Sequence, residues 1–230
     1  MDSKTSATLP LPTIRRYPVY LRAIAEMMAA GENYISSYVL AGRLGVDSVL
    51  ARKDLAMAGV PGKPRRGYPA RELFEAMNRA IGWDNATDAV LVGVGSLGRA
   101  LLGYSGFKEQ NLSVAVAFDI DPALAGTSVH GIKVRAVDEM QRLVRRMKLK
   151  LAILTVPGPD AQTCADELAA AGIKGILNFT PVRLSVPAGV IVQNVDLAQP
   201  LAVLSHSISK EEVQTGFRGP VDAPADVTSA

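Results

Sequence analysis

Ala89-Val90-Leu91-Val92-Gly93-Val94-Gly95-Ser96-Leu97-Gly98 is the stretch that decides the fold of this chain. Its continuous apolar run is typical of a strand that is covered on both faces of a parallel sheet. The glycines follow in the Gly-x-Gly-x-x-Gly pattern, which links such a strand to a helix in dinucleotide-binding folds. The sequence therefore predicts a Rossmann-type turn at residues 93–98.

Each residue of this turn has its own expected role. Gly93 allows the tight turn, Gly95 lets the backbone approach a pyrophosphate, and Gly98 lets the helix pack close to the sheet. The helix begins at Ser96 and Leu97, where free backbone N–H groups attract phosphate. The pattern predicts a nucleotide site; a structural glycine turn without a ligand is the alternative.

An acidic residue completes the nucleotide pattern. The next predicted strand ends in Phe118-Asp119, and a carboxylate there accepts hydrogen bonds from ribose hydroxyls and repels a 2′-phosphate. No Lys or Arg occurs at 120–124. The expected ligand is therefore NAD(H) rather than NADP(H).

Strand and helix patterns alternate from residue 88 onward, which predicts an α/β fold with a parallel sheet. Strands are predicted at 88–93, 113–119, 132–135, 150–156, 174–178 and 190–194. Helices are predicted at 96–104, 137–147, 160–171 and 197–208.

The N-terminal part predicts a helix-turn-helix instead. Its helices are expected at 14–30, 36–44, 48–58 and 70–81. Thr13 is the expected N-cap of the first, Ser36 or Ser37 of the second, and Asp47 or Ser48 of the third. A glycine-containing turn between the second and third helices is typical of this motif.

A basic surface accompanies this motif. Residues 43–71 contain seven Lys and Arg against two Asp, and the Pro- and Gly-rich segment 61–69 predicts a wing that lies against DNA. An ordinary solvated face is the alternative. The candidate DNA-contacting residues are Ser36, Ser37, Arg52, Lys53, Lys63, Arg65, Arg66 and Tyr68.

Composition and isolated residues exclude other classes. No apolar run is long enough to span a bilayer, and the N-terminus does not resemble a secretory signal. The single Cys164 favours a reducing, cytoplasmic setting, and His130 and His206 do not form a metal-binding pattern. None of these three residues has the partners of a catalytic acid or base, so the chain is not expected to be an enzyme.

Several phrases resemble the Rex family of redox-sensing bacterial transcriptional repressors over about residues 8–208. They are Thr13-Ile14-Arg15-Arg16, Tyr20-Leu21-Arg22, Ile35-Ser36-Ser37, Leu44-Gly45-Val46, Arg52-Lys53-Asp54-Leu55, the 93–102 stretch with Tyr104, Phe118-Asp119-Ile120-Asp121-Pro122, residues 171–181 (Ala-Gly-Ile-Lys-Gly-Ile-Leu-Asn-Phe-Thr-Pro) and Asn194-Val195-Asp196-Leu197-Ala198. The last two are the most specific.

The resemblance implies a homodimer that binds operator DNA when NADH is low and releases it when NADH rises. Each subunit would carry a winged helix and a Rossmann domain and would exchange its last helix, 197–208, with its partner. Arg22, Tyr104 and Asp196 would make contacts that differ between the two states. The nicotinamide pocket would be formed by Val156, Pro157, Phe179, Thr180, Pro181 and Leu197.

The DNA side departs from the family in two places. Ala56-Met57-Ala58-Gly59 stands where the family usually has Ser-Tyr-Phe-Gly, and the wing at 62–68 reads Gly-Lys-Pro-Arg-Arg-Gly-Tyr instead of Gly-Lys-Arg-Gly-Val-Gly-Tyr. The first change removes groups that could contact phosphate, and the second adds charge. The operator sequence or affinity is therefore expected to differ from the family norm.

The expected organisation is a lead-in, two domains, an exchanged helix and a tail. The boundaries are 1–12 (disordered), 13–85 (winged helix), 86–196 (Rossmann), 197–208 (exchanged helix) and 209–230 (disordered). Two other functions stay open at this point. One is an NAD-dependent oxidoreductase with an accessory N-terminal domain, and the other is a nucleotide-binding scaffold that never touches DNA.

Overall fold

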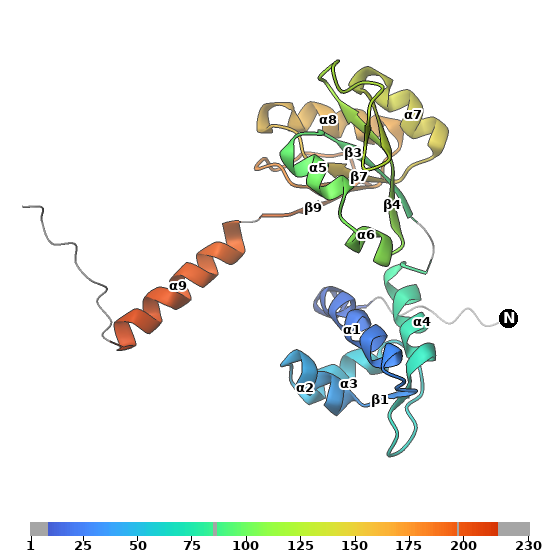
Figure 1. Cartoon of the computed structure of the whole chain (residues 1–230), viewed down its shortest axis with the longest axis vertical. Coiled ribbons are helices and arrows are strands. Elements are labelled where there is room, and N and C mark those ends of the chain that lie inside the picture. The colour runs from blue at the N-terminus through green and yellow to red at the C-terminus, as the bar shows by residue number, and fades with distance from the viewer. Residues whose placement is uncertain (1–8, 85–86, 197, 216–230) are drawn as a thin grey trace, which may run out of the picture. The chain divides into compact units, whose positions relative to one another are not determined.

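The computed structural model describes residues 9–84, 87–196 and 198–215 (Figure 1). The chain divides into two compact units. One contains the residues up to Ala89 together with Gly103–Ala115, and the other contains Val90–Leu102 and the residues from Val116 onward. No helix within the described ranges is long and apolar enough to cross a membrane.

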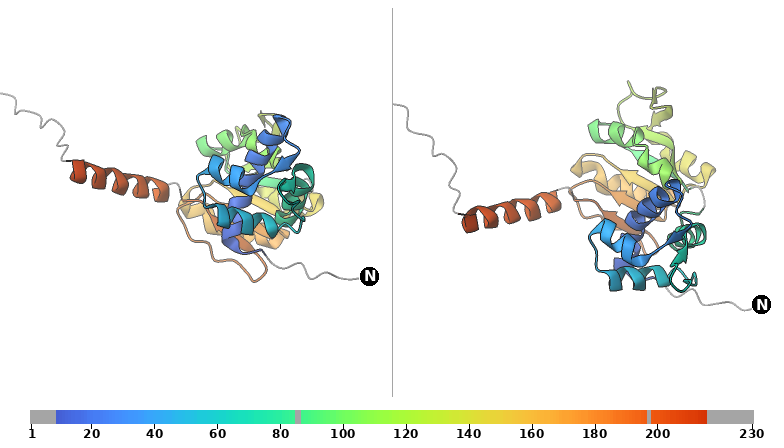
Figure 2. Two further views of the ribbon diagram at one scale, coloured as in Figure 1. Left: turned by 90° about the horizontal axis from the view of Figure 1, so that it is seen from below. Right: turned by 60° about the horizontal axis from the view of Figure 1, so that its bottom comes forward.

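The N-terminal part is a winged helix, with α1–α4 gathered in one cluster (Figure 2). Its elements are α1 (Leu11–Ala29), β1 (Tyr34–Ile35), α2 (Ser37–Leu44), α3 (Ser48–Ala56), β2 (Tyr68–Pro69) and α4 (Ala70–Ile81). The four helices share one buried core, and its largest members include Tyr17, Tyr20, Ile24, Met27, Leu40, Leu55, Leu73 and Met77. The antiparallel pair β1–β2 joins the C-terminal end of the wing to the residues just before α2.

The helix-turn-helix has the expected local signals. The Ser36 hydroxyl accepts a hydrogen bond from Val39 N, and the Asp47 carboxylate accepts one from Leu50 N. Of the alternatives that the sequence left open, Ser36 and Asp47 are therefore the caps of α2 and α3. Gly45 ends α2 at φ 64°, a left-handed conformation that glycine adopts without strain.

The prediction for the start of α1 was wrong. The helix begins at Leu11, with Pro12 in its first turn, so residues 11 and 12 are helical rather than disordered. Thr13 is not an N-cap: it lies inside the helix and is 2% exposed. Its hydroxyl has a partner elsewhere in the fold, which local sequence rules cannot reveal.

That partner is Asp54 of α3, whose buried carboxylate joins α3 to α1. Thr13 Oγ1 donates to Asp54 Oδ1 at 2.9 Å, and Tyr20 Oη donates to Oδ2 at 2.9 Å. Arg16 donates from Nε to Oδ2 at 2.6 Å and from Nη2 to Oδ1 at 2.8 Å. The Tyr17 hydroxyl donates to the Asp54 backbone carbonyl at 3.0 Å. We call these five residues the Asp54 clamp.

The clamp shifts the pKa values of its members. Burial opposes ionisation of Asp54, but the hydrogen bonds from Arg16, Thr13 and Tyr20 outweigh it and hold the pKa of Asp54 below its usual value. Burial, reinforced by the neighbouring Asp54, raises the pKa of Tyr17 and of Tyr20 to about 12. Asp54 is therefore charged and both tyrosines are neutral at physiological pH.

The C-terminal part is built on a sheet of order β5-β6-β4-β3-β7-β8-β9. The strands are β3 (Thr87–Val92), β4 (Leu112–Asp119), β5 (Ser128–Val129), β6 (Ile132–Ala136), β7 (Leu151–Leu154), β8 (Gly175–Asn178) and β9 (Ile191–Asn194). The pairs β4–β6, β7–β8 and β8–β9 are parallel, whereas the short edge strand β5 runs antiparallel to β6. Apart from β5, this is the Rossmann strand order, and it reverses between β3 and β7.

The helices of this part are α5 (Ser96–Leu102), α6 (Gly106–Glu109), α7 (Met140–Met147), α8 (Gly158–Ala171) and α9 (Ala198–Thr215), with a 3₁₀ turn at Val137–Glu139. The predicted strands and helices are present to within three residues, except at the end of the last helix. α9 continues to Thr215, so residues 209–215 are helical, not disordered as expected. Strands β1, β2 and β5 and helix α6 were not predicted individually, because two to four residues carry no clear period.

The Asp54 clamp makes a testable contribution to stability. We expect Asp54→Asn to lower the free energy of unfolding of the winged helix by about 3 kcal/mol at neutral pH, because Arg16 then faces a buried partner without charge. Trp83, the single tryptophan, packs against the core of α1–α4, so its fluorescence in a urea titration reports this unfolding. Glu75→Gln, which removes only an exposed pair with Arg71, is the control and should change stability by less than about 0.5 kcal/mol.

The difference in free energy of unfolding between Asp54→Asn and the native chain should also depend on pH. Since the folded pKa of Asp54 lies below its unfolded value of about 3.9, its contribution is complete above that value and is lost as pH falls through the folded pKa. The difference should therefore be constant between about pH 5 and 7 and narrow below about pH 4. A difference that stays constant in acid would contradict this role for the carboxylate.

Candidate functional site: a basic winged helix and a nucleotide cavity

One face of α3 is buried and the opposite face carries charge. Ala51, Asp54 and Leu55 point into the core, whereas Arg52 and Lys53 are exposed. The Asp54 clamp fixes the rotation of α3 about its own axis, and this rotation keeps Arg52 and Lys53 on the solvent side. The arrangement agrees with the predicted recognition helix, and the contact of these two cations with DNA stays a prediction.

The predicted wing is a hairpin. Lys63 and Gly67 form an antiparallel bridge, and the turn between them places Arg65 at φ 62°. Lys63 Nζ donates a hydrogen bond to the Tyr34 hydroxyl at 3.1 Å, and the Arg66 guanidinium lies 5.6 Å from the centre of the same ring. The wing therefore presents three exposed cations, two of them against Tyr34. The remaining candidates, Ser36, Ser37 and Tyr68, are partly buried near the base of the wing.

The glycine turn has the geometry that each glycine was expected to provide. Gly93 lies at φ 98°, and a Cβ on it would approach the Thr155 backbone to 2.8 Å. A Cβ on Gly98 would lie 1.9 Å from the Gly93 carbonyl oxygen, so no side chain fits there. A Cβ on Gly95 would meet nothing within 4 Å, which leaves the backbone open on that side. Ser96 and Leu97 follow as the first residues of α5.

Two side chains hold this turn from neighbouring strands. Asp119, at the end of β4, accepts a hydrogen bond from Val94 N at 2.6 Å and a second from Asp121 N at 2.9 Å. Thr155, just after β7, donates to the Gly93 carbonyl at 2.7 Å. Backbone hydrogen bonds also join the end of β3 to both neighbouring strands, because Gly93 N donates to Phe118 O of β4 and Thr155 N, just after β7, donates to Val92 O.

A cavity of about 700 Å³ opens at this point, where the strand order reverses. Gly93, Gly95, Asp119, Val156 and Pro157 are among its lining residues, so five of the predicted nucleotide-site residues face one space. Such a position, outside the carboxyl ends of the strands, is where open α/β sheets bind ligands. Cys164 also lines the cavity, and burial raises the pKa of its thiol to about 11, which makes it a poor nucleophile at neutral pH.

The other predicted pocket residues line a second cavity, of about 580 Å³. Phe179, Thr180 and Pro181 are among its lining residues, together with Asp196, which was expected to be a switch residue. The loop that follows β8 is held by the fully buried Asn178. Its side-chain carbonyl accepts hydrogen bonds from Thr180 N and Oγ1. Its amide donates to Val182 O and to Asn194 Oδ1 at the end of β9. Leu197 lies outside the described residues.

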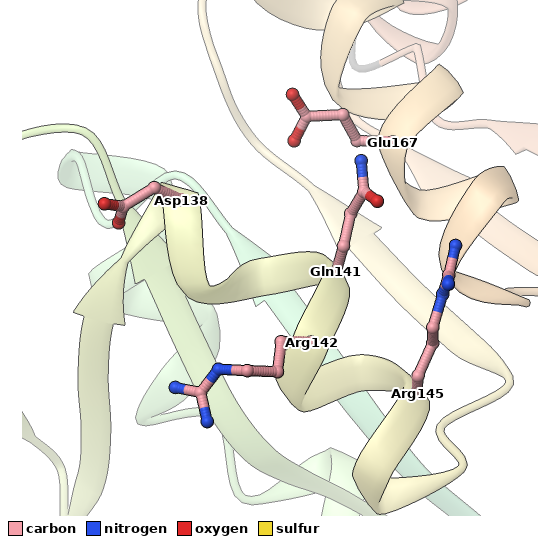
Figure 3. Close-up of a pocket in the computed structure, with 5 residues that line it drawn as sticks. All are labelled: Asp138, Gln141, Arg142, Arg145 and Glu167. Atoms are coloured by element: carbon pink, nitrogen blue, oxygen red, sulfur yellow. The ribbon is translucent and has the colours of Figure 1, made fainter.

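A third hollow, of about 600 Å³, lies along α7 and α8 and carries charges of both signs (Figure 3). Arg142 and Arg145 extend from α7, Glu167 from α8. Both guanidinium groups already have partners, since Arg142 pairs with Glu139 at 3.6 Å and Arg145 donates to the Ala170 carbonyl at 2.8 Å. This hollow therefore has the features of an ordinary solvated surface. In the parts of the chain that the structure describes, no group of His, Cys, Asp and Glu could hold a metal ion.

The three residues expected to switch contacts are all exposed. Arg22 lies on α1 in the first unit, and Tyr104, 53% exposed, packs edge-on against Phe107. Asp196 accepts a hydrogen bond from Ala198 N at the start of α9. Arg22 and Asp196 belong to different units, and their pairing stays a prediction.

Two family descriptions match separate parts of the chain. Residues 8–56 match the family described as Putative DNA-binding protein N-terminus. Residues 84–182 match the family described as CoA binding domain. The two matches fall on the winged helix and on the Rossmann sheet respectively.

Relatives that span both parts decide the family. The Redox-sensing transcriptional repressor Rex of Treponema denticola is 42% identical over 84% of this chain and 92% of that protein. The Rex protein of Porphyromonas gingivalis strain ATCC 33277 is 42% identical over 88% of this chain and 93% of its own length. The chain belongs to the Rex family.

Solved Rex-family structures confirm the predicted fold class, a winged helix followed by a Rossmann-type parallel sheet. RSP, a Rex-family repressor, matches with a TM-score of 0.81 and 32% identity over 93% of this chain and all of RSP. RSP in complex with beta-NAD+ and operator DNA matches with a TM-score of 0.83 and 33% identity over 91% of this chain and 97% of RSP. RSP in complex with beta-NADH matches with a TM-score of 0.80 and 32% identity over 92% of this chain and 100% of RSP.

Sequence reasoning missed three residues that organise these sites: Asp54, Thr155 and Asn178. Asp54 and Thr155 bond to residues far away in the chain, so no local pattern reveals their partners. Asn178 bonds to the nearby Thr180 and Val182 and to Asn194 at the end of β9. A signal existed for Asp54 alone. Thr13, Arg16, Tyr17 and Tyr20 recur at the spacing of one helix face, which indicates a polar partner packed against α1.

The glycine turn gives a direct test of this geometry. We expect Gly98→Ala to lower the free energy of unfolding by about 1–3 kcal/mol, because the new methyl group meets the Gly93 carbonyl and the turn must move. Gly95→Ala has open space for its methyl group and should change stability by less than about 0.5 kcal/mol. Differential scanning calorimetry of the two variants measures this, and equal destabilisation would contradict the assigned roles.

Proposed function

We propose that this protein is a redox-sensing transcriptional repressor. It binds operator DNA through the winged helix when NADH is scarce, and it releases the DNA when NADH binds in the Rossmann cavity. The ligand acts by binding alone, and no chemical step on the nucleotide is required. A protein with this role acts in the cytoplasm, where bacterial DNA is.

The observation that carries this proposal is that one chain contains both a basic winged helix and a dinucleotide-type cavity. The exposed cations of α3 and of the wing are suited to phosphate, and the glycine turn with Asp119 is suited to a dinucleotide. Identity of about 40% to Rex repressors extends across both parts. An oxidoreductase usually has His, Lys or Tyr as the acid or base beside the nicotinamide. None of these three residue types is among the described residues that line the 700 Å³ cavity.

The cavity also favours NAD(H) over nucleotides with a phosphorylated ribose. Asp119, Asp160 and Glu167 are among its lining residues, and the described residues that line it include no Lys or Arg. Three carboxylates repel the additional ribose phosphate of NADP(H) or of coenzyme A. This is a reason to assign NAD(H), although the matched family description names coenzyme A.

The proposed repressor is a homodimer, in which α9 packs on the partner. Leu201, Leu204 and Ile208 recur at the spacing of one helix face, and each is at least half exposed in the single chain. An apolar stripe of this kind needs a covering surface. A second copy of the chain, related by twofold symmetry, supplies that surface and gives two DNA-binding units for one operator.

Sensing requires that the two ligands oppose each other. If NADH and operator DNA prefer different conformations of the dimer, each weakens the binding of the other by the same coupling free energy. A nucleotide that binds both conformations equally releases nothing, however tightly it binds. NADH must therefore distinguish the two conformations more strongly than NAD+ does.

Titration of the operator complex tests the proposal. DNA fragments retained by the protein from its own genome provide a labelled operator, and fluorescence anisotropy follows release as NADH or NAD+ is added. We expect NADH to release the DNA at a concentration at least about tenfold lower than NAD+, a differential of about 1.4 kcal/mol. Equal release by the two nucleotides would contradict redox sensing, and failure to retain any DNA at low salt would favour the scaffold alternative.

The variant Asp119→Ala separates sensing from DNA binding. It removes the carboxylate that faces the cavity and the hydrogen bond to Val94 N, so we expect NADH to release this variant only at much higher concentration. Its affinity for the operator without nucleotide should equal that of the native chain. A normal NADH response of Asp119→Ala would overturn the assignment of the cavity.

The wing predicts a change in salt dependence. Arg65→Gln with Arg66→Gln should weaken binding to every DNA sequence, because phosphate contacts carry no sequence information. The slope of log affinity against log salt should become shallower by about 0.9 for each phosphate that the variant no longer neutralises. The pair Arg142→Gln and Arg146→Gln removes the same charge from α7, which is not part of the winged helix, and is the control. An unchanged slope in the wing variant would refute the predicted contacts.

A further inference from the structure

We infer that Val49 of α3 reads thymine by contacting its methyl group in the major groove, and that it is therefore a specificity-determining residue. The inference rests on the proposed function and goes beyond it, since the candidate contacts on α3 given above are the cations Arg52 and Lys53. Val49 is 47% exposed, although it lies in a helix whose other face is buried.

The position of Val49 on the helix is the first step of the argument. Val49 precedes Arg52 by three residues and Lys53 by four, so it lies on the same face, one turn nearer the N-terminus. The buried residues Ala51, Asp54 and Leu55 occupy the opposite face. Val49 is therefore at the centre of the exposed surface, with the two cations on either side of it.

A cap holds the first turn of α3, and the contact of its last turn with α1 fixes the orientation of this face. The Asp47 carboxylate accepts a hydrogen bond from Leu50 N at 2.8 Å and holds the first turn. The Asp54 clamp holds the last turn against α1. Val49 is thus presented by a rigid helix, at the end from which recognition helices contact base edges.

The chemistry of Val49 selects its partner on DNA. Its side chain has no hydrogen-bond donor or acceptor, so it can read neither the acceptors of guanine nor the amino groups of cytosine and adenine. The C5 methyl of thymine is the one apolar group that the bases present in the major groove. Arg52 and Lys53 attract phosphate and bring the face to the DNA, and Val49 then gains free energy only where a methyl group meets it.

The chain offers a matched control. Val19 of α1 is the same residue type with 52% exposure, and it lies outside the helix-turn-helix. Val49→Ala and Val19→Ala each remove two methyl groups, and alanine has the higher helix propensity, so neither change opposes folding of its helix.

The experiment uses the full-length chain and deoxyuridine, which is thymine without its methyl group. A tight-binding duplex is selected from a random pool, and each thymine is replaced in turn by deoxyuridine. For the native chain and for Val19→Ala, we expect at least one replacement to weaken binding about fourfold, the effect of about 0.8 kcal/mol for one buried methyl group. For Val49→Ala, the same replacement should have a clearly smaller effect, because the two methyl groups that extend furthest from the helix toward the thymine methyl are removed and only Cβ is left.

The outcomes separate the inference from the proposed function. If no replacement weakens the native chain, or if Val49→Ala keeps the same sensitivity as Val19→Ala, then Val49 does not read thymine, while NADH-dependent release of the selected duplex can still be measured. If the native chain selects no duplex from the pool, the proposed function and the inference are overturned together.

Discussion

The orientation of α3 depends on one buried carboxylate. A charged group that is removed from water must be compensated almost completely by hydrogen bonds and opposite charge. Asp54 satisfies this requirement with donors from three turns of α1, namely Thr13, Arg16 and Tyr20. Because these donors have fixed positions on α1, rotating α3 would break the hydrogen bonds and leave the charge unpaired. The polar contact therefore specifies one arrangement of two helices that apolar packing alone would hold less uniquely.

The nucleotide cavity depends on a different constraint, the close approach of backbone segments. The turn after β3 passes so near to the backbone after β7 that Gly93 cannot carry a side chain, and the Gly93 carbonyl in turn excludes a side chain at Gly98. Thr155 and Asp119 then fix the turn through hydrogen bonds from the neighbouring strands. The open side of Gly95 is what remains for a ligand. The two parts of the molecule thus fix their functional elements differently. A buried charge fixes the orientation of α3, and the exclusion of side chains fixes the position of the glycine turn.

Much of this was predictable from sequence, because the deciding patterns are local. Hydrophobic periodicity indicated the principal helices and strands, and the glycine spacing placed the turn at 93–98. Residues whose roles depend on distant partners were not predictable in the same way. Thr13 satisfies the rules for an N-cap, yet its hydroxyl bonds to Asp54, 41 residues away. The extension of α9 to Thr215 was missed because Ser209, Lys210, Glu211 and Glu212 are polar residues that also suit a disordered tail. Thr155 becomes recognisable only when β3 and β7, which are far apart in sequence, lie side by side, and Asn178 only when β9 pairs with β8.

The same clamp bears on how a signal could pass through α1. Arg22 follows Thr13 by nine residues, about two and a half turns, so it lies on the side of α1 opposite the clamp. α1 therefore has one face bonded to α3 and another face exposed at Arg22. A helix held by several short hydrogen bonds moves together with its partner, since separating them would cost the buried ion pair. On the proposed function, a contact that displaces Arg22 displaces Arg52 and Lys53 by the same rigid motion. On that proposal the switch requires no deformation of α3, because α1 and α3 move as one body.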